Sequence, residues 1–206
     1  MKINKVKISK ETTEISACEF IQNECTNSII NSLENIEEIK NYTFDSCIFN
    51  NIDFTNIKLE DINMIDTIFN NCDLSNQSFD RKLLTRIEFN NCKLIGTSFI
   101  ESSLKDIKIE NSNCKYTNFS ASKIQNLQIN SSDFSEASFI EPEIKNIEIN
   151  DCNLTEAEFI HTKLNKVDFS TCKINKTIFD MYSVKGIIVD SFQCQQLVGM
   201  LGVEIK

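Results

Sequence analysis

The chain has 206 residues, 41% of them hydrophobic, and its 30 acidic and 21 basic residues give a formal net charge of −9. This length is enough for one elongated domain. The acidic balance argues against a nucleic-acid-binding protein, because such proteins neutralise phosphates with Lys and Arg. No apolar run is long enough for a membrane span, and Met1–Lys7 lacks the apolar stretch of a secretion signal, so we expect a cytoplasmic protein.

Residues 1–40 are less regular than the repeat that follows them, and they predict an irregular first coil, a loop and a cap. Cys18, Phe20 and Cys25 are spaced as in a shifted first coil. Ile30 and Ile39 are nine residues apart, one fewer than two five-residue steps, so the phase changes between them. Residues 31–38 are therefore expected to form a loop or a short helical cap.

Residues 41–190 contain a strict repeat. From Phe44 to Val189 every fifth residue is apolar, and the series holds 13 of the 15 Phe residues. A helix repeats its apolar stripe every 3.6 residues and a strand every two, so neither explains a period of five. Like residues recur at every twentieth position, so four five-residue sides close one square turn of an all-β solenoid. One predicted column of stacked core rings comprises Phe79, Phe99, Phe119, Phe139, Phe159 and Phe179.

Polar residues are expected to form the corners, because the chain has only 4 Gly and 1 Pro. Asn, Asp, Ser and Thr can bond their own backbone at such turns. Asn50, Asn70 and Asn90 share a column and predict amide ladders between coils about 4.8 Å apart. Gln77 and Lys82 place polar side chains at inward positions, where we expect local bulging or side-chain rotation.

The cysteines and the single histidine give no sign of a metal site, a cofactor or an enzyme. Six of the 9 Cys residues fall on inward repeat positions, which favours small buried fillers over disulfides. These six are Cys47, Cys72, Cys92, Cys114, Cys152 and Cys172. No CxxC motif occurs, His161 has no nucleophile beside it, and no pocket is indicated.

Residues 191–206 predict a short C-terminal α-helix and tail. Asp190 and Ser191 can cap a helix start, and Gly202 can end it. The apolar face of such a helix can cap its own chain or bind a second chain, and isologous pairing is the commonest way to close an oligomer. The residues predicted for a dimer interface are Phe192, Leu197, Met200, Leu201 and Val203.

The repeat units resemble those of a known family. Cys72–Asn76, Ala137–Phe139 and Cys152–Glu156 are similar to the A(D/N)LXX unit of pentapeptide-repeat proteins, over roughly residues 40–190. This resemblance implies a right-handed quadrilateral β-helix with Phe or Leu stacked inside and a small residue two places earlier.

The tail resembles a narrower group. Val189–Gln193, Leu197 and Leu201–Val203 are similar to the C-terminal segment of the Qnr quinolone-resistance proteins. That similarity implies a head-to-head homodimer through the tail and binding to type II topoisomerases. Many Qnr proteins carry two projecting loops, but this chain has no insertion from Phe44 to Val189. The alternatives are a smooth rod that binds gyrase, as MfpA-type relatives are thought to do, or a protein that gives no quinolone protection.

Charge is distributed unevenly over the four sides, which begin at residues 42, 47, 52 and 57 and recur every twenty residues. The first side has 8 basic and 4 acidic residues, whereas the second has 1 and 6 and the fourth has 2 and 7. A stiff rod with acidic flanks resembles a DNA duplex, and a basic groove made for DNA could accept it. The candidate contact residues are Asp61, Asp80, Glu101, Glu141 and Glu158 on the fourth side and Glu88, Glu110 and Glu148 on the second.

The resulting hypothesis is a DNA mimic that binds DNA gyrase or topoisomerase IV and protects it from quinolones or toxins. Two rods joined end to end would span about 70 Å, or about twenty base pairs. The alternative is a cytosolic scaffold or immunity-type interaction module with a different partner. Neither alternative requires a cofactor or direct contact with nucleic acid.

Overall fold

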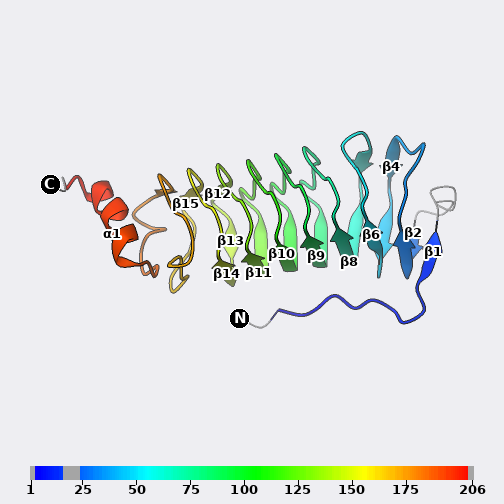
Figure 1. Ribbon diagram of the computed structural model, residues 1–206, viewed down its shortest axis with the longest axis horizontal. Coiled ribbons are helices and arrows are strands. Elements are labelled where there is room, and N and C mark those ends of the chain that lie inside the picture. The colour runs from blue at the N-terminus through cyan, green and yellow to red at the C-terminus, as the bar shows by residue number, and fades with distance from the viewer. Residues whose placement is uncertain (1–2, 16–23, 204–206) are drawn as a thin grey trace.

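The computed structural model describes residues 3–15 and 24–203. They form a right-handed, four-sided β-solenoid of about 8 turns that ends in one short helix (Figure 1). Partners in neighbouring turns of the regular part are twenty residues apart, as Ile107 and Leu127 are. The predicted fold class is therefore confirmed, and a turn of twenty residues built from five-residue sides has four sides.

Among the described residues, the first and second sides carry a parallel sheet of 11 strands. Its long strands are β8 (Asn63–Asn70), β9 (Leu83–Asn90), β10 (Ser103–Glu110) and β11 (Lys123–Asn130). Its short strands are β1 (Thr13–Ile15), β2 (Glu24–Thr26), β3 (Ser28–Ile30), β5 (Thr43–Asp45), β6 (Ile48–Asn50), β13 (Glu143–Ile144) and β14 (Ile147–Asn150). Each long strand bends at a corner residue of positive φ, such as Asp106 at 56°, so that one strand serves two sides.

The third and fourth sides are joined by shorter pairings. The fourth side carries β4 (Glu38–Lys40), β7 (Lys58–Glu60), β12 (Ser138–Ile140), β15 (Glu158–Ile160) and β16 (Ile178–Phe179). The third side has single bridges, of which Asp73 with Lys93 is one. These two sides lack long strands because their inward residues alternate with tight turns. One such turn is closed by a hydrogen bond of 3.1 Å from the Thr97 N–H to the Leu94 carbonyl.

Stacked Phe rings fill the centre of the tube. The column from Phe79 to Phe179 has centroid separations between 4.8 and 5.4 Å and interplanar angles between 4° and 13°. These separations follow the spacing of the coils, because each ring sits one turn above the last. Cys47, Cys72, Cys92, Cys114, Cys152 and Cys172 are buried free thiols beside these columns.

The corners use more residue types than expected. Asn amides form the predicted ladders, with Asn70 donating to the Asn50 side chain at 2.9 Å and Asn90 donating to Asn70 at 3.1 Å. Charged residues such as Glu101 and Lys166 also adopt the left-handed conformation, with φ of 56° and 67°. That conformation costs a non-Gly residue about 1 kcal/mol or more, and bonds to the next coil offset the cost. The Glu101 N–H, for example, donates to the Ser120 carbonyl at 3.1 Å.

The N-terminal region contains the predicted phase change. Ile29 pairs with Ile48, nineteen residues on, whereas Ile39 pairs with Leu59, twenty residues on. The missing residue lies in the predicted segment 31–38, of which residues 31–37 form a loop with one turn rather than a helix and Glu38 begins β4. The first coil expected around Cys18 and Phe20 lies outside the described residues.

An N-terminal arm, residues 3–12, runs back along the solenoid (Figure 1). The backbone N–H and the side-chain amide of Asn4 donate to the Asp106 carboxylate at 3.2 and 3.0 Å. The Lys7 N–H donates to Asp66 at 2.8 Å. These contacts attach the arm to the corner between the first and second sides.

The C-terminal end consists of α1 (Ser191–Val198) followed by the 3₁₀ turn η2 (Gly199–Leu201). Asp190 caps α1, and Gly202 follows η2 with a left-handed φ of 70°. Within the described ranges, no helix has the length and apolar character needed to cross a membrane.

Candidate functional site

The acidic residues of the fourth side lie at corners and at outward strand positions. Asp61, Glu101 and Glu141 occupy the corner column, where a positive φ of 47° to 56° turns the side chain outward. Asp80 and Glu158 lie within the side itself and are partly buried. The turn spacing therefore brings these carboxylates into rows along one edge of the rod, near the labels β4, β12 and β15 in Figure 1.

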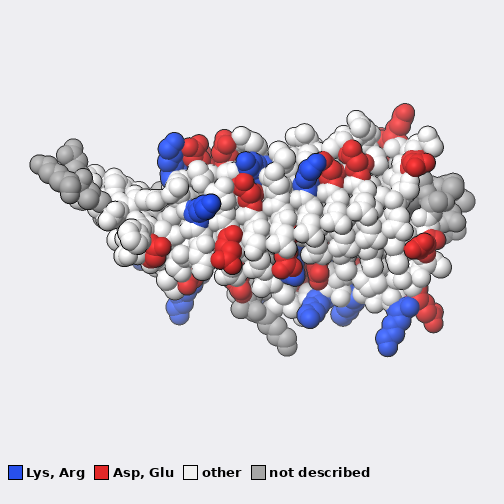
Figure 2. Space-filling model, in the orientation of Figure 1, with Lys and Arg blue, Asp and Glu red and all other residues white. Residues whose placement is uncertain are grey.

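Several of these carboxylates already have partners within the chain. Asp61 accepts from the Lys82 ammonium at 2.8 Å, and that contact holds the pKa of Asp61 below its usual range. Asp80 accepts from the Ile100 N–H at 2.8 Å and from the Ser98 hydroxyl. Glu158 accepts from the Ser138 hydroxyl at 3.2 Å. Figure 2 accordingly shows basic as well as acidic side chains along this edge.

The second side has a similar mixture. Glu110 is 2.5 Å from the Lys108 ammonium, and Glu148 accepts from Gln128 and Asn150 at 3.4 and 3.2 Å. Glu88 is half-buried and lies near the N-terminal arm, in a hollow that Asn4 also lines. On both sides the negative charge is fixed in place, but part of it is neutralised locally.

Asp61, Glu101 and Glu141 are the exposed members of the predicted contact residues. The Arg81 guanidinium lies 4.0 Å from Glu101, at the limit of an ion pair. Glu141 is exposed at its corner, beside Pro142 and His161 in a shallow hollow. His161 points outward as well, with its Nδ1 3.2 Å from Asp180. No group of three or more His, Cys, Asp or Glu side chains in the described ranges is arranged to hold a metal ion.

The C-terminal helix covers the last coil. The side-chain amide of Gln193 donates to the carbonyls of Phe169 and Cys172 at 2.9 and 2.7 Å, and Leu197 is half-buried against the core. Of the residues predicted for the dimer interface, Phe192, Met200 and Val203 are exposed. The side chain of Leu201 lies outside the described part of the chain. The helix therefore caps its own rod and also presents apolar side chains at the tip.

A family model, described as the pentapeptide repeat region, matches residues 38–119, 62–139 and 82–159. A second, described as pentapeptide repeats (8 copies), matches residues 152–181. The chain belongs to the pentapeptide repeat family. Comparison with curated protein sequences gave no match.

Solved pentapeptide repeat structures are similar at low sequence identity. QnrB1, described as a plasmid-mediated fluoroquinolone resistance protein, is 20% identical in one trypsin-treated variant form, with a TM-score of 0.47 over 94% of this chain and 95% of that chain. HetL from the cyanobacterium Nostoc sp. strain PCC 7120, described as involved in heterocyst differentiation regulation, is 12% identical, with a TM-score of 0.42 over 90% and 92%. A pentapeptide repeat protein of the Arabidopsis thaliana thylakoid lumen is 21% identical, with a TM-score of 0.29 over 45% and 65%. At these identities we draw no function from the likenesses.

Sequence reasoning missed the role of Gln193 in this pentapeptide repeat protein. Asp190 followed three residues later by Gln193 is a capping-box pattern, and the structure contains both of its hydrogen bonds. The same Gln193 side chain turns inward and donates to two carbonyls of the last coil. The capping pattern was the available signal, because it places the Gln193 side chain at the helix start, next to the end of the solenoid.

Proposed function

We propose that this pentapeptide repeat protein is a DNA-mimicking binding protein that engages a type II topoisomerase, DNA gyrase or topoisomerase IV, and protects it from quinolones or toxins. The observation that carries the proposal is a stiff rod with acidic rows fixed on two opposite sides. Complementary potentials steer association and fix orientation, so a basic groove that receives DNA is a suitable partner surface.

The resemblance of the tail at Val189–Gln193 to Qnr proteins adds support from the sequence. We propose that two chains pair head to head through Phe192, Met200 and Val203, whose side chains are exposed at the tip of the rod. Leu197 lies between this surface and the core, because it is half-buried and packs against the core. The paired rods would present their acidic sides over about twice the length of one chain.

The direct test is a gyrase supercoiling assay with purified protein, with and without a quinolone. The proposal expects micromolar protein to change supercoiling or to reduce the quinolone-trapped cleavage complexes. A DNA duplex of about twenty base pairs should compete with the protein for gyrase, and added salt should weaken the interaction. Unchanged supercoiling and cleavage at micromolar protein would remove the topoisomerase proposal.

A scaffold or immunity-type module with a different partner is the second candidate. The internal pairing of Asp61 with Lys82 and of Glu110 with Lys108 favours it, because paired carboxylates attract a basic groove less strongly. A pull-down from lysate separates the two proposals. Recovery of gyrase or topoisomerase IV subunits supports mimicry, whereas a different stable partner supports the scaffold.

A further inference from the structure

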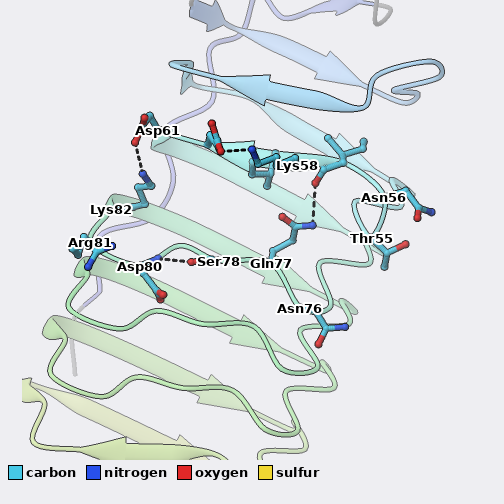
Figure 3. Close-up of a pocket in the computed structure, with 13 residues that line it drawn as sticks. Thr55, Asn56, Lys58, Asp61, Asn76, Gln77, Ser78, Asp80, Arg81 and Lys82 are labelled. Carbon is cyan, nitrogen blue, oxygen red and sulfur yellow. Dashed lines mark hydrogen bonds and ion pairs between the residues drawn. The ribbon is translucent and has the colours of Figure 1, made fainter.

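The ladder of coils on the fourth side is interrupted at one step. On the N-terminal side of this step β4 pairs with β7, and on its C-terminal side Ser78 pairs with Ser98. Between β7 and residues 77–81 the described chain makes no backbone hydrogen bond. A cleft of about 700 Å³ opens there, and Figure 3 shows Gln77 and Lys82 reaching across it from the lower coil.

The Gln77 side chain spans this cleft and is longer than its counterparts in later coils. Later coils have Thr or Ala at this inward position, and Thr97 donates to the Leu74 carbonyl of the preceding coil at 2.9 Å. Gln77 makes the equivalent bond to the Phe54 carbonyl at 2.7 Å, but its donor atom is two atoms further from the backbone. The steps at Ala137 and Ala157 are closed without any side-chain donor, so a short side chain at this position allows closure, whereas the longer Gln77 side chain occupies the space between the two coils.

The corner above the cleft also departs from the pattern. From Asn76 to Lys176, every residue of this corner column has a positive φ, including Gly96 at 66°. Asn56, one turn earlier in the same column, does not have a positive φ. The chain after Asn56 consequently turns toward β4, and β7 pairs with β4 alone.

Two strand edges with unused hydrogen-bonding groups face each other across this cleft. In the next step down, the Ser98 N–H donates to the Gln77 carbonyl at 2.9 Å and the Phe79 N–H donates to the Ser98 carbonyl at 2.8 Å. The corresponding bonds from Ser78 and Leu59 are not made. An open strand edge is a template for another strand, since its donors and acceptors can pair with any extended backbone.

An amide group already occupies one of these hydrogen-bonding positions. The Gln77 carboxamide donates to the Ile57 carbonyl at 3.1 Å, the acceptor that the Ser78 N–H would use in a regular coil. A side-chain amide has the same donor and acceptor chemistry as a peptide group. The cleft thus holds an internal substitute for the backbone of an added strand.

We propose that this cleft binds an extended segment of a partner protein as an added parallel strand. Backbone pairing with the open edge of β7 provides the affinity, and Gln77 swings away as the segment enters. Ile57 and Leu59 form the apolar inner wall, while the rim ion pairs Lys58–Glu60 and Lys82–Asp61 leave the entrance polar and nearly neutral. The segment that fits alternates apolar inward residues with polar outward ones. This proposal does not depend on the topoisomerase proposal.

A labelled synthetic peptide with the sequence of residues 95–103 is a suitable probe. In the intact protein, residues 95–103 pair with the edge of residues 77–81 that faces the next coil. The open edge of β7 faces the cleft in the same direction, so the peptide should pair with it in the same way. Fluorescence anisotropy should show saturable binding, and a version N-methylated at alternate residues should not bind. Hydrogen exchange on the wild-type protein should show that the peptide protects the amides of Leu59 and Ser78. Absence of that protection, or equal binding of the methylated peptide, would overturn the proposal.

Gln77→Thr tests the cause of the opening. The shorter side chain should close the cleft and weaken peptide binding about tenfold or more, as expected for losing one or two backbone hydrogen bonds. Thr177→Ser, in the same column at a closed step, is the matched control and should leave binding unchanged. Unaltered binding to a folded Gln77→Thr variant would contradict the proposal. A self-association that Gln77→Thr abolishes would instead assign the cleft to a second copy of the chain.

Discussion

The side-chain amide of Gln193 donates a hydrogen bond of 2.7 Å to the carbonyl oxygen of Cys172, and so attaches the terminal helix to the last coil of the rod. A solenoid needs such a cover, because its final turn has no neighbour to bury its apolar face or to accept its backbone bonds. The helix itself is short, with only Gln193 fully buried. The stability of this end should therefore depend strongly on one polar side chain.

Gln193→Ala should destabilise the protein by about 1–3 kcal/mol, because two buried carbonyls lose their donor. Chemical denaturation gives the loss, and hydrogen exchange should place it in the last coil, around Phe169 and Cys172. Gln196→Ala is the matched control, since Gln196 bonds the Asn175 side chain at an exposed position. Equal effects of the two substitutions would contradict the capping role.

Phe119→Ala should destabilise the protein by about 3–5 kcal/mol, the usual cost of truncating a fully buried aromatic side chain. Its ring is stacked between Phe99 and Phe139 at 4.8 and 4.9 Å, so the cavity would interrupt the column in the middle of the rod. Tyr116→Ala, at a residue that is 52% exposed and lies away from the proposed interface, serves as the control and should change the unfolding free energy little. A negligible loss for Phe119→Ala would place that ring outside the core.

Phe192→Asp combined with Met200→Asp should convert the proposed dimer into monomers, because both side chains lie in the apolar tip that is proposed as its interface. Charged side chains cannot be buried in an apolar contact without a partner. Light scattering measures the mass, and Tyr116→Asp, at an exposed aromatic residue in the middle of the rod, is the control. An unchanged dimer in the double variant would exclude the tip. Leu197 is less suitable for this test, because its substitution would also disturb the cap.

The period of five predicted the tube, because an apolar residue at every fifth position can face one centre only if the chain turns a corner at each step. It also identified Gln77 and Lys82 as departures, since polar side chains there cannot join the core. Whether such a side chain rotates out or holds the coils apart depends on which carbonyls lie within reach. In the structure Gln77 finds the Phe54 carbonyl and Lys82 finds Asp61. The sequence pattern therefore does not indicate whether a polar side chain at an inward position rotates outward or separates the coils.

The path of the N-terminal arm was equally inaccessible from the sequence. Its residues lack the repeat, and its position depends on two corner carboxylates, Asp66 and Asp106, that look like ordinary surface residues in the pattern. Both are almost fully buried in the structure. Contacts between the arm and the rod are long-range in sequence, so only the folded coordinates bring Asn4 and Asp106 together.

Charge reversal on the acidic sides should weaken binding to gyrase. Glu88→Lys with Glu141→Lys should lower the association rate by roughly tenfold at low salt, within the range that charge steering provides, and less at high salt. Asp53→Lys with Glu136→Lys makes the same change in net charge on the third side, and it is the matched control. Surface plasmon resonance measures both rates. An equal effect of the two pairs would point to net charge alone and against recognition by the acidic sides.

Acid should loosen the arm through Asp106. Burial raises the pKa of this carboxyl, but hydrogen bonds from Asn4 and from Asn126 outweigh it and hold the pKa below its usual range. A group whose pKa is lower in the folded state contributes stability above its unfolded pKa of about 3.9, and the contribution is lost as pH falls through the folded pKa. Asp106→Asn should therefore flatten the fall in the urea midpoint below pH 4. Asp151→Asn, at an exposed corner, should retain the wild-type slope, and an unchanged slope for Asp106→Asn would show that other carboxyls govern the acid response.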